Sequence, residues 1–266
     1  MFTSTINRDL MTDHPGWTDD GRGRTRRVMR ANGAVWLLTF PNRDSTVEIQ
    51  RVSGAGAPPT TDVFTPATLT GTTELTRALV DAGPVARIRN GDIWDSLATG
   101  VIRQVIRAGQ ARLLYLRLCE SHGERVRTPT GQVNLFPSAD TVLDLSDMEF
   151  ARLGLAFKRE TLRAAARAVT AHNTEWLRLT PTDLLIELQK IERVGPWTAG
   201  AVVADVSNDF SLYPYADLAV RTWAGRLAPE TDWPSEETRF AKRWRQVGLD
   251  QLGTLTALTL AQGAHV

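Results

Sequence analysis

The spacing of apolar residues changes near Asp92, and this change restricts the folds open to the chain. Within residues 32 to 64, the run Ala34 to Phe40 is ended by Pro41, and Thr46 to Val52 alternates apolar and polar residues. Both patterns are typical of β-strands. After Asp92 the apolar residues recur at three-and-four spacing, which places them on one face of a helix. The sequence therefore predicts an α+β chain, with a larger helical part after the β-structure.

The expected helices follow one another almost to the end of the chain. Most begin near Ser, Thr, Asp or Pro and stop near Gly or Asn, as helix termini do. We expect a small α/β amino-terminal domain over residues 1–85 and a helical domain over residues 86–266. The first domain should contain a strand or turn at 64–69 and a helix at 73–82. The later helices are expected at 92–106, 113–121, 138–142, 146–153, 157–172, 181–191, 196–206, 218–227, 235–245 and 249–260.

Composition excludes several classes of protein. The 266 residues are 42% hydrophobic and 23% charged, which is typical of one large globular domain or two small ones. No apolar run approaches the roughly 18 residues that cross a bilayer, and the first ten residues lack the features of a signal peptide. We therefore expect a cytoplasmic protein. The single cysteine, Cys119, excludes a cysteine-based metal cluster, and the four histidines lack the spacing of metal ligands.

Bulk charge does not indicate a partner. The 31 Lys and Arg residues nearly balance 30 Asp and Glu residues, so any basic surface must be local. The densest basic run is Arg22 to Arg27, RGRTRR. It is either an arm that binds DNA with salt-sensitive affinity or a group of solvated, mobile arginines near a terminus.

A helical break lies inside the segment Leu184 to Leu227. The first helix stops at Val194-Gly195, and a second begins at Pro196, a residue type favoured in the first helical turn. The free backbone N–H groups of that turn form an anion site that fits a DNA phosphate, near Trp197, Thr198 and Ala199. The alternative is a helical hairpin that only packs.

This segment resembles a known family. The run Val194 to Ala199, VGPWTA, followed by Tyr213 to Arg221, YPYADLAVR, resembles the helix-hairpin-helix motif and catalytic-aspartate loop of the helix-hairpin-helix DNA glycosylase superfamily. It is most similar to the 3-methyladenine DNA glycosylase II branch. Trp94 to Gln110 and Gly154 to Ala166 extend the resemblance in family order. The resemblance implies a mainly α-helical glycosylase fold with a small β-containing amino-terminal domain and an active-site cleft in the helical part.

The resemblance assigns the catalytic carboxylate to Asp217. Breaking a base from its sugar builds positive charge on the deoxyribose, which a carboxylate stabilises while it orients or deprotonates water. Asp217 also directly precedes the helix at 218–227, so it is expected to cap that helix. Both roles are compatible. Asp205 and Asp209 flank a polar connector and are expected to be turn or surface residues.

Trp197 stands where bifunctional members of the superfamily carry a lysine. That lysine attacks the sugar as an amine, which an indole cannot do. The resemblance therefore implies a monofunctional enzyme that uses water and leaves an abasic site. The alternative for Trp197 is an aromatic residue of the core.

An extruded base must be replaced in the stack and held in a pocket. Gln104 and Val105 match the wedge region of the family, although Val105 fits a core-facing helix equally well by spacing. Aromatic faces bind electron-poor alkylated bases. Besides Trp197, the aromatic candidates for the base pocket are Trp94, Tyr213, Tyr215 and Trp223.

The hairpin departs from the family pattern. Family members usually carry Pro-Gly where this chain has Glu192-Arg193, so a glycine that permits positive φ is missing and we expect the turn to differ in shape. The family often holds a structural Na⁺ or K⁺ ion at hairpin carbonyls, here near Val194. Arg193 is a further candidate for phosphate contact, as is the backbone at Gly195.

These observations predict a monofunctional DNA glycosylase that acts on a damaged, alkylated purine in double-stranded DNA as a monomer, with no required cofactor. It would associate with the nucleoid through DNA. Two alternatives remain open: a glycosylase for oxidised, bulky or hypermodified bases, and a DNA-binding module without catalysis. A bifunctional glycosylase/lyase is disfavoured by Trp197. A pure binder has no need of Asp217, whose charge repels DNA.

Overall fold

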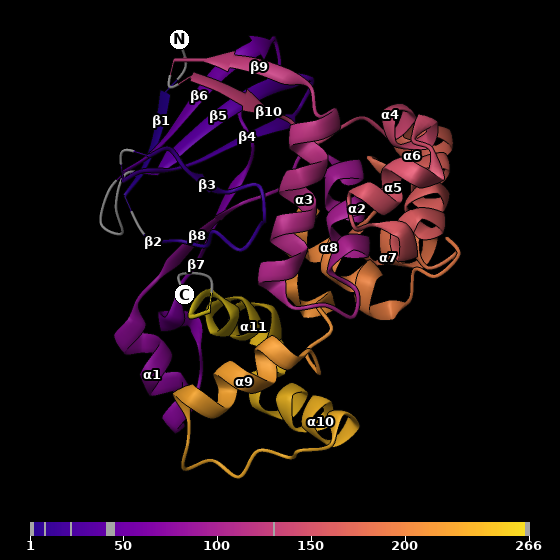
Figure 1. The fold of residues 1–266 in the computed structure, drawn as a ribbon. Helices are drawn as coiled ribbons and strands as arrows, with labels where there is room; N and C mark the ends of the chain where they lie inside the picture. The colour runs from indigo at the N-terminus through magenta and orange to yellow at the C-terminus, as the bar shows by residue number, and fades with distance from the viewer. Residues whose placement is uncertain (1–2, 8, 22, 41–45, 130, 264–266) are drawn as a thin grey trace.

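The amino-terminal part is built around an antiparallel sheet in the computed structural model, which describes residues 3–7, 9–21, 23–40, 46–129 and 131–263. Its five strands lie in the order β1-β6-β5-β4-β3 (Figure 1). The expected strand at 34–40 is confirmed, and the one at 46–52 continues to Gly54. The strands are β1 (Thr3–Asn7), β3 (Thr18–Asp19), β4 (Thr25–Ala31), β5 (Ala34–Phe40) and β6 (Thr46–Gly54).

A second sheet connects this part to the helices. It has three strands in the order β2-β8-β7, namely β2 (Asp9–Leu10), β8 (Val85–Ile88) and β7 (Thr61–Phe64). The strand or turn expected at 64–69 is a short 3-10 turn, η1 (Pro66–Thr68). The expected helix at 73–82 is α1 (Glu74–Ala82), and the Thr73 hydroxyl caps it by accepting from the Thr76 amide.

The helical part contains the elements predicted after Asp92, with shifted ends. Asp92 caps α2, which ends at Arg103 rather than at Ile106. The described helices are α2 (Ile93–Arg103), α3 (Ala108–His122), α4 (Ala139–Asp144), α5 (Asp147–Arg152), α6 (Arg159–Trp176), α7 (Pro181–Leu188), α8 (Pro196–Ser207), α9 (Leu218–Leu227), α10 (Glu237–Gly248) and α11 (Leu252–Ala261), with the 3-10 turns η2 (Ala156–Lys158), η3 (Phe210–Leu212) and η4 (Leu249–Gln251). None of them is long and apolar enough to cross a membrane.

One hairpin contradicts the expectation of continuous helices. Strands β9 (Arg125–Thr128) and β10 (Gly131–Asn134) pair with each other between α3 and α4. Val126 and Leu135 form a small buried cluster with Val28 and Leu37 of the first sheet. The hairpin therefore extends from the helical part onto the amino-terminal sheet, as Figure 1 shows.

Two hydrophobic clusters show which elements of the chain pack together. A large cluster lies among α2, α3, α6, α7 and α8, and a second lies among α1, α9, α10 and α11. Leu75 and Leu79 of α1 share the second cluster with Val220 and Ala224 of α9. A helix of the predicted amino-terminal domain thus packs with the carboxy-terminal helices. The division at residue 85 stays a prediction about folding units.

Candidate active site

The hairpin is formed as the sequence predicted, and its second helix begins at Pro196. In the turn before it, the Val194 amide donates to the Ile191 carbonyl at 3.0 Å. Arg193 has φ of +64°, so it takes the left-handed conformation that a glycine would take there. The missing glycine is therefore compensated by a strained arginine, at a cost of about 1 kcal/mol.

Gln104 joins the wedge region to the hairpin. Its side-chain amide donates to the Arg193 carbonyl at 3.1 Å and to the Thr198 hydroxyl at 2.9 Å. The Lys158 ammonium donates to the Gln104 carbonyl at 2.5 Å, and burial lowers the pKa of Lys158. Three segments that carry the family resemblance therefore meet at Gln104, whose amide is already used within the protein.

Val105 stands beyond the end of α2 with φ of +61°, and its side chain is 102% exposed. The alternative that it faces the core is wrong. Phe157, next to Lys158, is 97% exposed and was not predicted as a site residue. Its only sequence signal is an aromatic residue directly before Lys158-Arg159 in the segment from Gly154. Two exposed apolar side chains thus flank the contact between Lys158 and Gln104.

Asp217 caps α9 and also contacts the hairpin. Its Oδ1 atom accepts from the Ala219 amide at 2.8 Å, and its Oδ2 atom accepts from the Trp197 indole N–H at 2.6 Å. Trp197 is half-buried, so it is not simply a core aromatic. The two donors fix the orientation of the carboxylate, and they connect the start of α9 to the start of α8.

A cavity of about 320 Å³ reaches the first turn of α9, although Asp217 itself is not among its lining residues. Ala219, which donates to Asp217, lines it together with Tyr213 and Trp223. Burial raises the pKa of Tyr213, and the charge of Asp217 raises it further. Two of the four aromatic candidates other than Trp197 therefore line this cavity.

The other aromatic candidates lie elsewhere. Trp94 is 4% exposed in the core of the helical part, where its indole donates to the Pro137 carbonyl at 2.8 Å. Its prediction as a pocket residue is wrong, because its position on α2 faces the other helices. The Tyr215 hydroxyl accepts from Arg245 at 3.1 Å, and Tyr215 is not among the cavity-lining residues. Trp197 does not line the cavity either, and its contact with the site is the hydrogen bond to Asp217.

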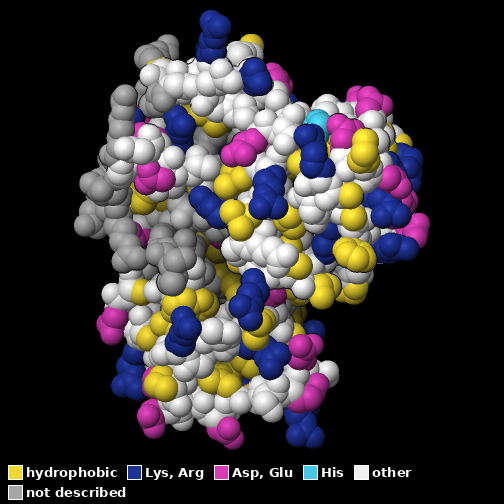
Figure 2. Space-filling model, in the orientation of Figure 1, with side chains coloured by type: hydrophobic (Ala, Val, Ile, Leu, Met, Phe, Trp, Pro, Cys, Tyr) yellow, Lys and Arg dark blue, Asp and Glu magenta, His cyan; other side chains and the backbone are white. Residues whose placement is uncertain are grey.

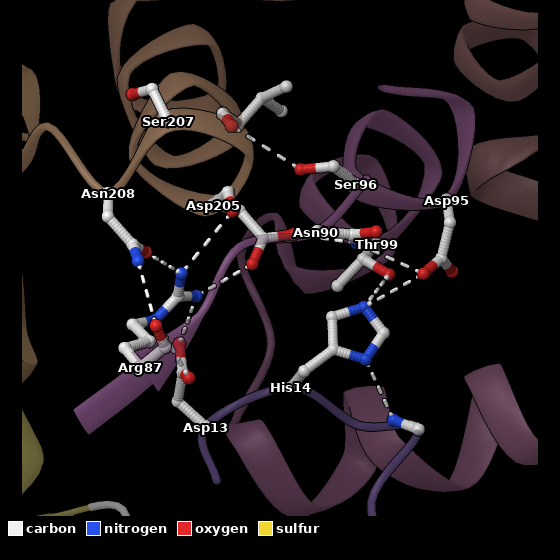
Figure 3. A network of polar contacts seen from close by, with 12 residues as sticks. Asp13, His14, Arg87, Asn90, Asp95, Ser96, Thr99, Asp205, Ser207 and Asn208 are labelled. Carbon is white, nitrogen blue, oxygen red and sulfur yellow. Dashed lines mark hydrogen bonds and ion pairs between the residues drawn. The ribbon is translucent and has the colours of Figure 1, made fainter. Parts of the chain in front are cut away.

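Arg87 of β8 also lines the cavity, and Figure 3 shows its polar contacts. It donates to Asp13 at 3.0 Å, to Asp205 at 2.6 Å and to the Asn208 side-chain carbonyl at 2.6 Å. Burial alone would lower the pKa of Arg87, but the charges of Asp13 and Asp205 raise it above its usual value. A buried cation held by two carboxylates is well compensated.

The prediction that Asp205 is a turn or surface residue is wrong. It lies on α8, and although burial alone would raise its pKa, Arg87 holds that pKa well below its usual range. The signal was absent from the local sequence, because its partner is 118 residues away. The expectation for Asp209 is confirmed: it caps η3 by accepting from the Ser211 amide at 3.1 Å.

The network continues to the amino-terminal sheet. Asn90 bridges Asp205 at 2.9 Å and Asp95 at 3.1 Å, and Asp95 pairs with His14 and Arg27. Burial opposes the charge of Asp95, but His14 and Arg27 lower its pKa to about 2. Ion pairs and hydrogen bonds therefore form an unbroken chain from Arg27 on β4 to Asp205 on α8.

This network also corrects the prediction for the run from Arg22 to Arg27. Arg27 is 3% exposed and bound to Asp95, while Arg24 pairs with Asp20 at 2.7 Å. Residues 25–27 belong to β4, so neither a DNA-binding arm nor a mobile terminus describes them. Arg22 lies outside the described residues.

Positive charge is local, as the near-zero net charge requires. Figure 2 shows Lys and Arg side chains along the middle of one face, over α3 and the carboxy-terminal helices, with hydrophobic side chains among them. Arg103 and Arg112 also line the cavity. In the described ranges, no group of three or more His, Cys, Asp or Glu residues is placed to hold a metal ion.

A helical hairpin is joined through Trp197 to an aspartate that caps the next helix, and the fold that carries them is found in solved DNA glycosylases. The chain is similar to the 3-methyladenine DNA glycosylase from Archaeoglobus fulgidus, with a TM-score of 0.72 and 16% identity over 100% of this chain and 99% of that one. It is also similar to the Clostridium acetobutylicum 8-oxoguanine glycosylase/lyase in complex with double-stranded DNA, with a TM-score of 0.66 and 15% identity over 100% and 99%. These similarities establish the fold.

A curated relative points the same way. The chain is 24% identical over 159 residues to the "Putative DNA-3-methyladenine glycosylase YfjP" of Bacillus subtilis. The match covers 57% of this chain and 54% of the relative, so the chain spans about half the length of that protein. No protein-family model matches the sequence.

Proposed function

We propose that the chain is a DNA glycosylase, which extrudes a damaged base from the duplex and hydrolyses its N-glycosidic bond. One observation carries the proposal: the Asp217 carboxylate is held by the Trp197 indole and by the amide of Ala219, a residue that lines a cavity. A carboxylate fixed there stabilises the positive charge that develops on the sugar as the base departs. It also orients or deprotonates the water that attacks the sugar.

The hairpin and the exposed apolar residues supply the contacts with DNA in this proposal. Gly195 supplies no side-chain cap to the first turn of α8, and nothing lies within 4 Å of the position that a Cβ atom on Gly195 would take, so a phosphate can approach these N–H groups. Arg193 is exposed beside that turn. Val105, with Phe157 nearby, fills the space that the extruded base leaves.

A structural Na⁺ or K⁺ ion at the hairpin also remains part of the proposal. The hairpin turn around Val194 offers carbonyl oxygens, which suit such an ion. The Arg193 carbonyl uses one lone pair for Gln104, at 3.1 Å, and keeps a second. No step of the reaction depends on the ion.

We propose further that the enzyme is monofunctional and that its substrate is an alkylated purine. Trp197 offers no amine, so water is the nucleophile and an abasic site is the product. Support for the substrate comes from Tyr213 and Trp223, which line the cavity and are of the residue types that suit an electron-poor base. The partner is damaged double-stranded DNA, bound by a single copy of the chain.

The test compares the wild type with Asp217→Asn on methylated duplex DNA. Released bases are measured by mass spectrometry, and abasic sites by alkaline cleavage. We expect release by the wild type alone. Asp209→Asn, which changes the cap of η3, is the matched control and should retain activity. If neither the wild type nor Asp217→Asn releases a base while both bind the duplex equally, the alkylated substrate is wrong or the chain is a DNA-binding module. A panel of oxidised and bulky lesions then distinguishes the two.

A further inference from the structure

The first turn of α3 borders the cavity, and its backbone N–H groups are open to a ligand. Helix α3 begins after Arg107, whose side chain makes no capping hydrogen bond. The first N–H groups of a helix have no carbonyl partner within it, and they carry the positive end of its dipole. Ala108 and Gly109, the first two residues of α3, line the cavity. Nothing lies within 4 Å of the position that a Cβ atom on Gly109 would take, so a ligand can approach this turn.

Two arginines that line the same cavity lie near this turn in the sequence. Arg103 belongs to the last turn of α2, and Arg112 follows the first turn of α3. Within the described ranges, neither side chain forms an ion pair. Arg112 donates through Nη2 to the Trp17 carbonyl and has further N–H groups to offer. The two carboxylates that line the cavity are both bound to Arg87, so they leave the charges of the other two arginines uncompensated.

A tyrosine hydroxyl in the cavity independently lacks a partner. Tyr213 is 8% exposed, and its hydroxyl makes no hydrogen bond in the part of the chain that the structure describes. The oxygen is not fully enclosed, so it opens onto the cavity that the residue lines. A buried hydroxyl without a partner is costly unless water or a ligand satisfies it. Its environment therefore favours a hydrogen-bond acceptor in the cavity.

Two charges act on this hydroxyl and place it in the site. Burial raises the pKa of Tyr213 most, the charge of Asp217 raises it further, and the charge of Arg103 lowers it. Coulomb interactions weaken with distance, so the hydroxyl lies close to both charged side chains. An acceptor bound between Tyr213 and Arg103 is thus a neighbour of whatever group contacts Asp217.

A backbone phosphate of DNA matches this set of donors. Free N–H groups at a helix N-terminus and arginine side chains both favour an anion, and the tyrosine adds a further donor. A damaged purine of the proposed kind carries no negative charge, so it does not account for two uncompensated arginines. The sugar at Asp217 has a phosphate on each side in the DNA strand. One of these phosphates can reach Arg103 while the sugar lies beside Asp217.

We propose that the first turn of α3, together with Arg103 and Arg112, forms a second phosphate site, separate from the hairpin, which binds a DNA phosphate next to the extruded nucleotide. Tyr213 donates to the same phosphate. This inference rests on the proposed binding of damaged DNA. The site holds the nucleotide by its backbone, so it positions the sugar without selecting the base.

The test measures binding of a duplex that carries one tetrahydrofuran, a stable analogue of an abasic site. In a series of such duplexes, a neutral methylphosphonate replaces one phosphate at a time around the tetrahydrofuran. Dissociation constants are measured at one fixed salt concentration, because phosphate contacts depend strongly on salt. We expect the wild type to bind about tenfold more weakly wherever a contacted phosphate becomes neutral.

Arg103→Gln identifies the phosphate that this site holds. The variant lacks the charge, so at one position next to the tetrahydrofuran its loss of affinity should be at most about threefold. Arg152→Gln is the matched control, because Arg152 also lies in the last turn of a helix, α5, and does not line the cavity. It should lose affinity at the same positions as the wild type. Equal losses for the wild type and Arg103→Gln at every position overturn the proposal.

Two substitutions of Gly109 test the helix terminus. Asp and Asn have nearly the same shape, and an acidic residue in the first turn stabilises a helix. We expect Gly109→Asp to bind the duplex without methylphosphonates about tenfold more weakly than Gly109→Asn, since its charge repels the phosphate. Thermal unfolding checks that Gly109→Asp is at least as stable as Gly109→Asn. Equal affinities of the two variants would show that no phosphate reaches this turn and would overturn the site.

The binding assay separates this inference from glycosylase activity. If the wild type releases no base but shows the expected pattern of losses, the enzymatic proposal fails and the phosphate site stands. If the wild type releases bases while Arg103→Gln shows the wild-type pattern, the phosphate site alone fails. A wild type that binds no duplex overturns both.

Discussion

At the scale of single residues, Arg193 shows how the hairpin tolerates a missing glycine. It holds φ of +64° with an exposed side chain. An alanine at this position keeps the strain, whereas a glycine removes it. We expect Arg193→Gly to have a free energy of unfolding about 1 kcal/mol larger than Arg193→Ala, measured by urea denaturation. Both variants lack the guanidinium, so equal stabilities would contradict strain at this turn.

Trp197 bears on two features of the proposed site. The first is the nucleophile, since an indole cannot form a Schiff base with the sugar. We expect borohydride to trap no covalent complex between the wild type and DNA that contains the damaged base or an abasic site. A bifunctional glycosylase/lyase serves as the positive control for trapping. A trapped adduct with the wild type would show lyase chemistry from another amine.

The second feature is the orientation of the carboxylate. Trp197→Phe keeps an aromatic ring and removes the N–H group that donates to Asp217 at 2.6 Å. Hydrogen bonds to charged groups contribute roughly 1.5–3 kcal/mol, so the rate of base release should fall about tenfold or more. Trp233→Phe removes a comparable indole donor far from the site, at the Ala228 carbonyl, and should leave the rate unchanged.

At the scale of elements, a substitution in the turn after α2 should change activity without changing stability. Val105 is fully exposed, so Val105→Ala should change the free energy of unfolding by less than about 0.5 kcal/mol. If Val105 fills the gap left by an extruded base, the same variant should release bases from duplex DNA several times more slowly. Leu113→Ala, at an exposed position of α3, is the control. Equal activities of both variants would exclude Val105 as a wedge.

The elements also show which parts of the fold local sequence can predict. Strand β5 and helices α1 and α9 were predicted within a residue because several apolar residues repeat in each. Strands β9 and β10 were missed because each is four residues long, and Val126 is the only buried residue in β9. A periodic signal needs more than one inward residue.

Some residues of the candidate site could likewise be predicted from the sequence, and others could not. The resemblance supplied Asp217 and its helix, and the aromatic types suggested Tyr213 and Trp223. The wall formed by Asp13 and Arg87 was not predicted, because these residues are 74 positions apart and neither has a distinctive neighbourhood. Likewise, the burial of Arg27 depends on Asp95, 68 residues away. Such pairs depend on tertiary packing, which a single sequence does not display.

At the scale of the whole molecule, buried ion pairs connect the first sheet to the helices, and they make stability dependent on pH. Asp95 has a pKa of about 2 in the folded protein, whereas an unfolded Asp has a pKa of about 3.9. A pKa lowered by folding stabilises the protein above the unfolded value, and this contribution is lost as pH falls through the folded value. Asp205 acts in the same direction.

We therefore expect the free energy of unfolding to decrease steeply between about pH 4 and pH 2. Urea denaturation at a series of pH values measures it. Asp95→Asn should be less stable at pH 7 and show a flatter decrease, because it has no proton to gain. Asp147→Asn, which changes an exposed ion pair, should follow the wild type. A wild-type stability that stays constant across this range would show that the buried carboxylates do not control acid unfolding.

Helix α8 supports two separate parts of the candidate site, the Asp217 carboxylate and the Arg87 side chain. Trp197, in its first turn, holds Asp217, and Asp205, in its last turn, holds the arginine behind Asp13. Trp197 and Asp205 are eight residues apart, so α8 separates the support of Asp217 from the support of Arg87 by about 12 Å along its axis. One residue added between them would turn Asp205 by about 100° relative to Trp197. The hairpin and Asp217 would then keep their contact, but Arg87 would lose Asp205 and the cavity wall around it would change shape.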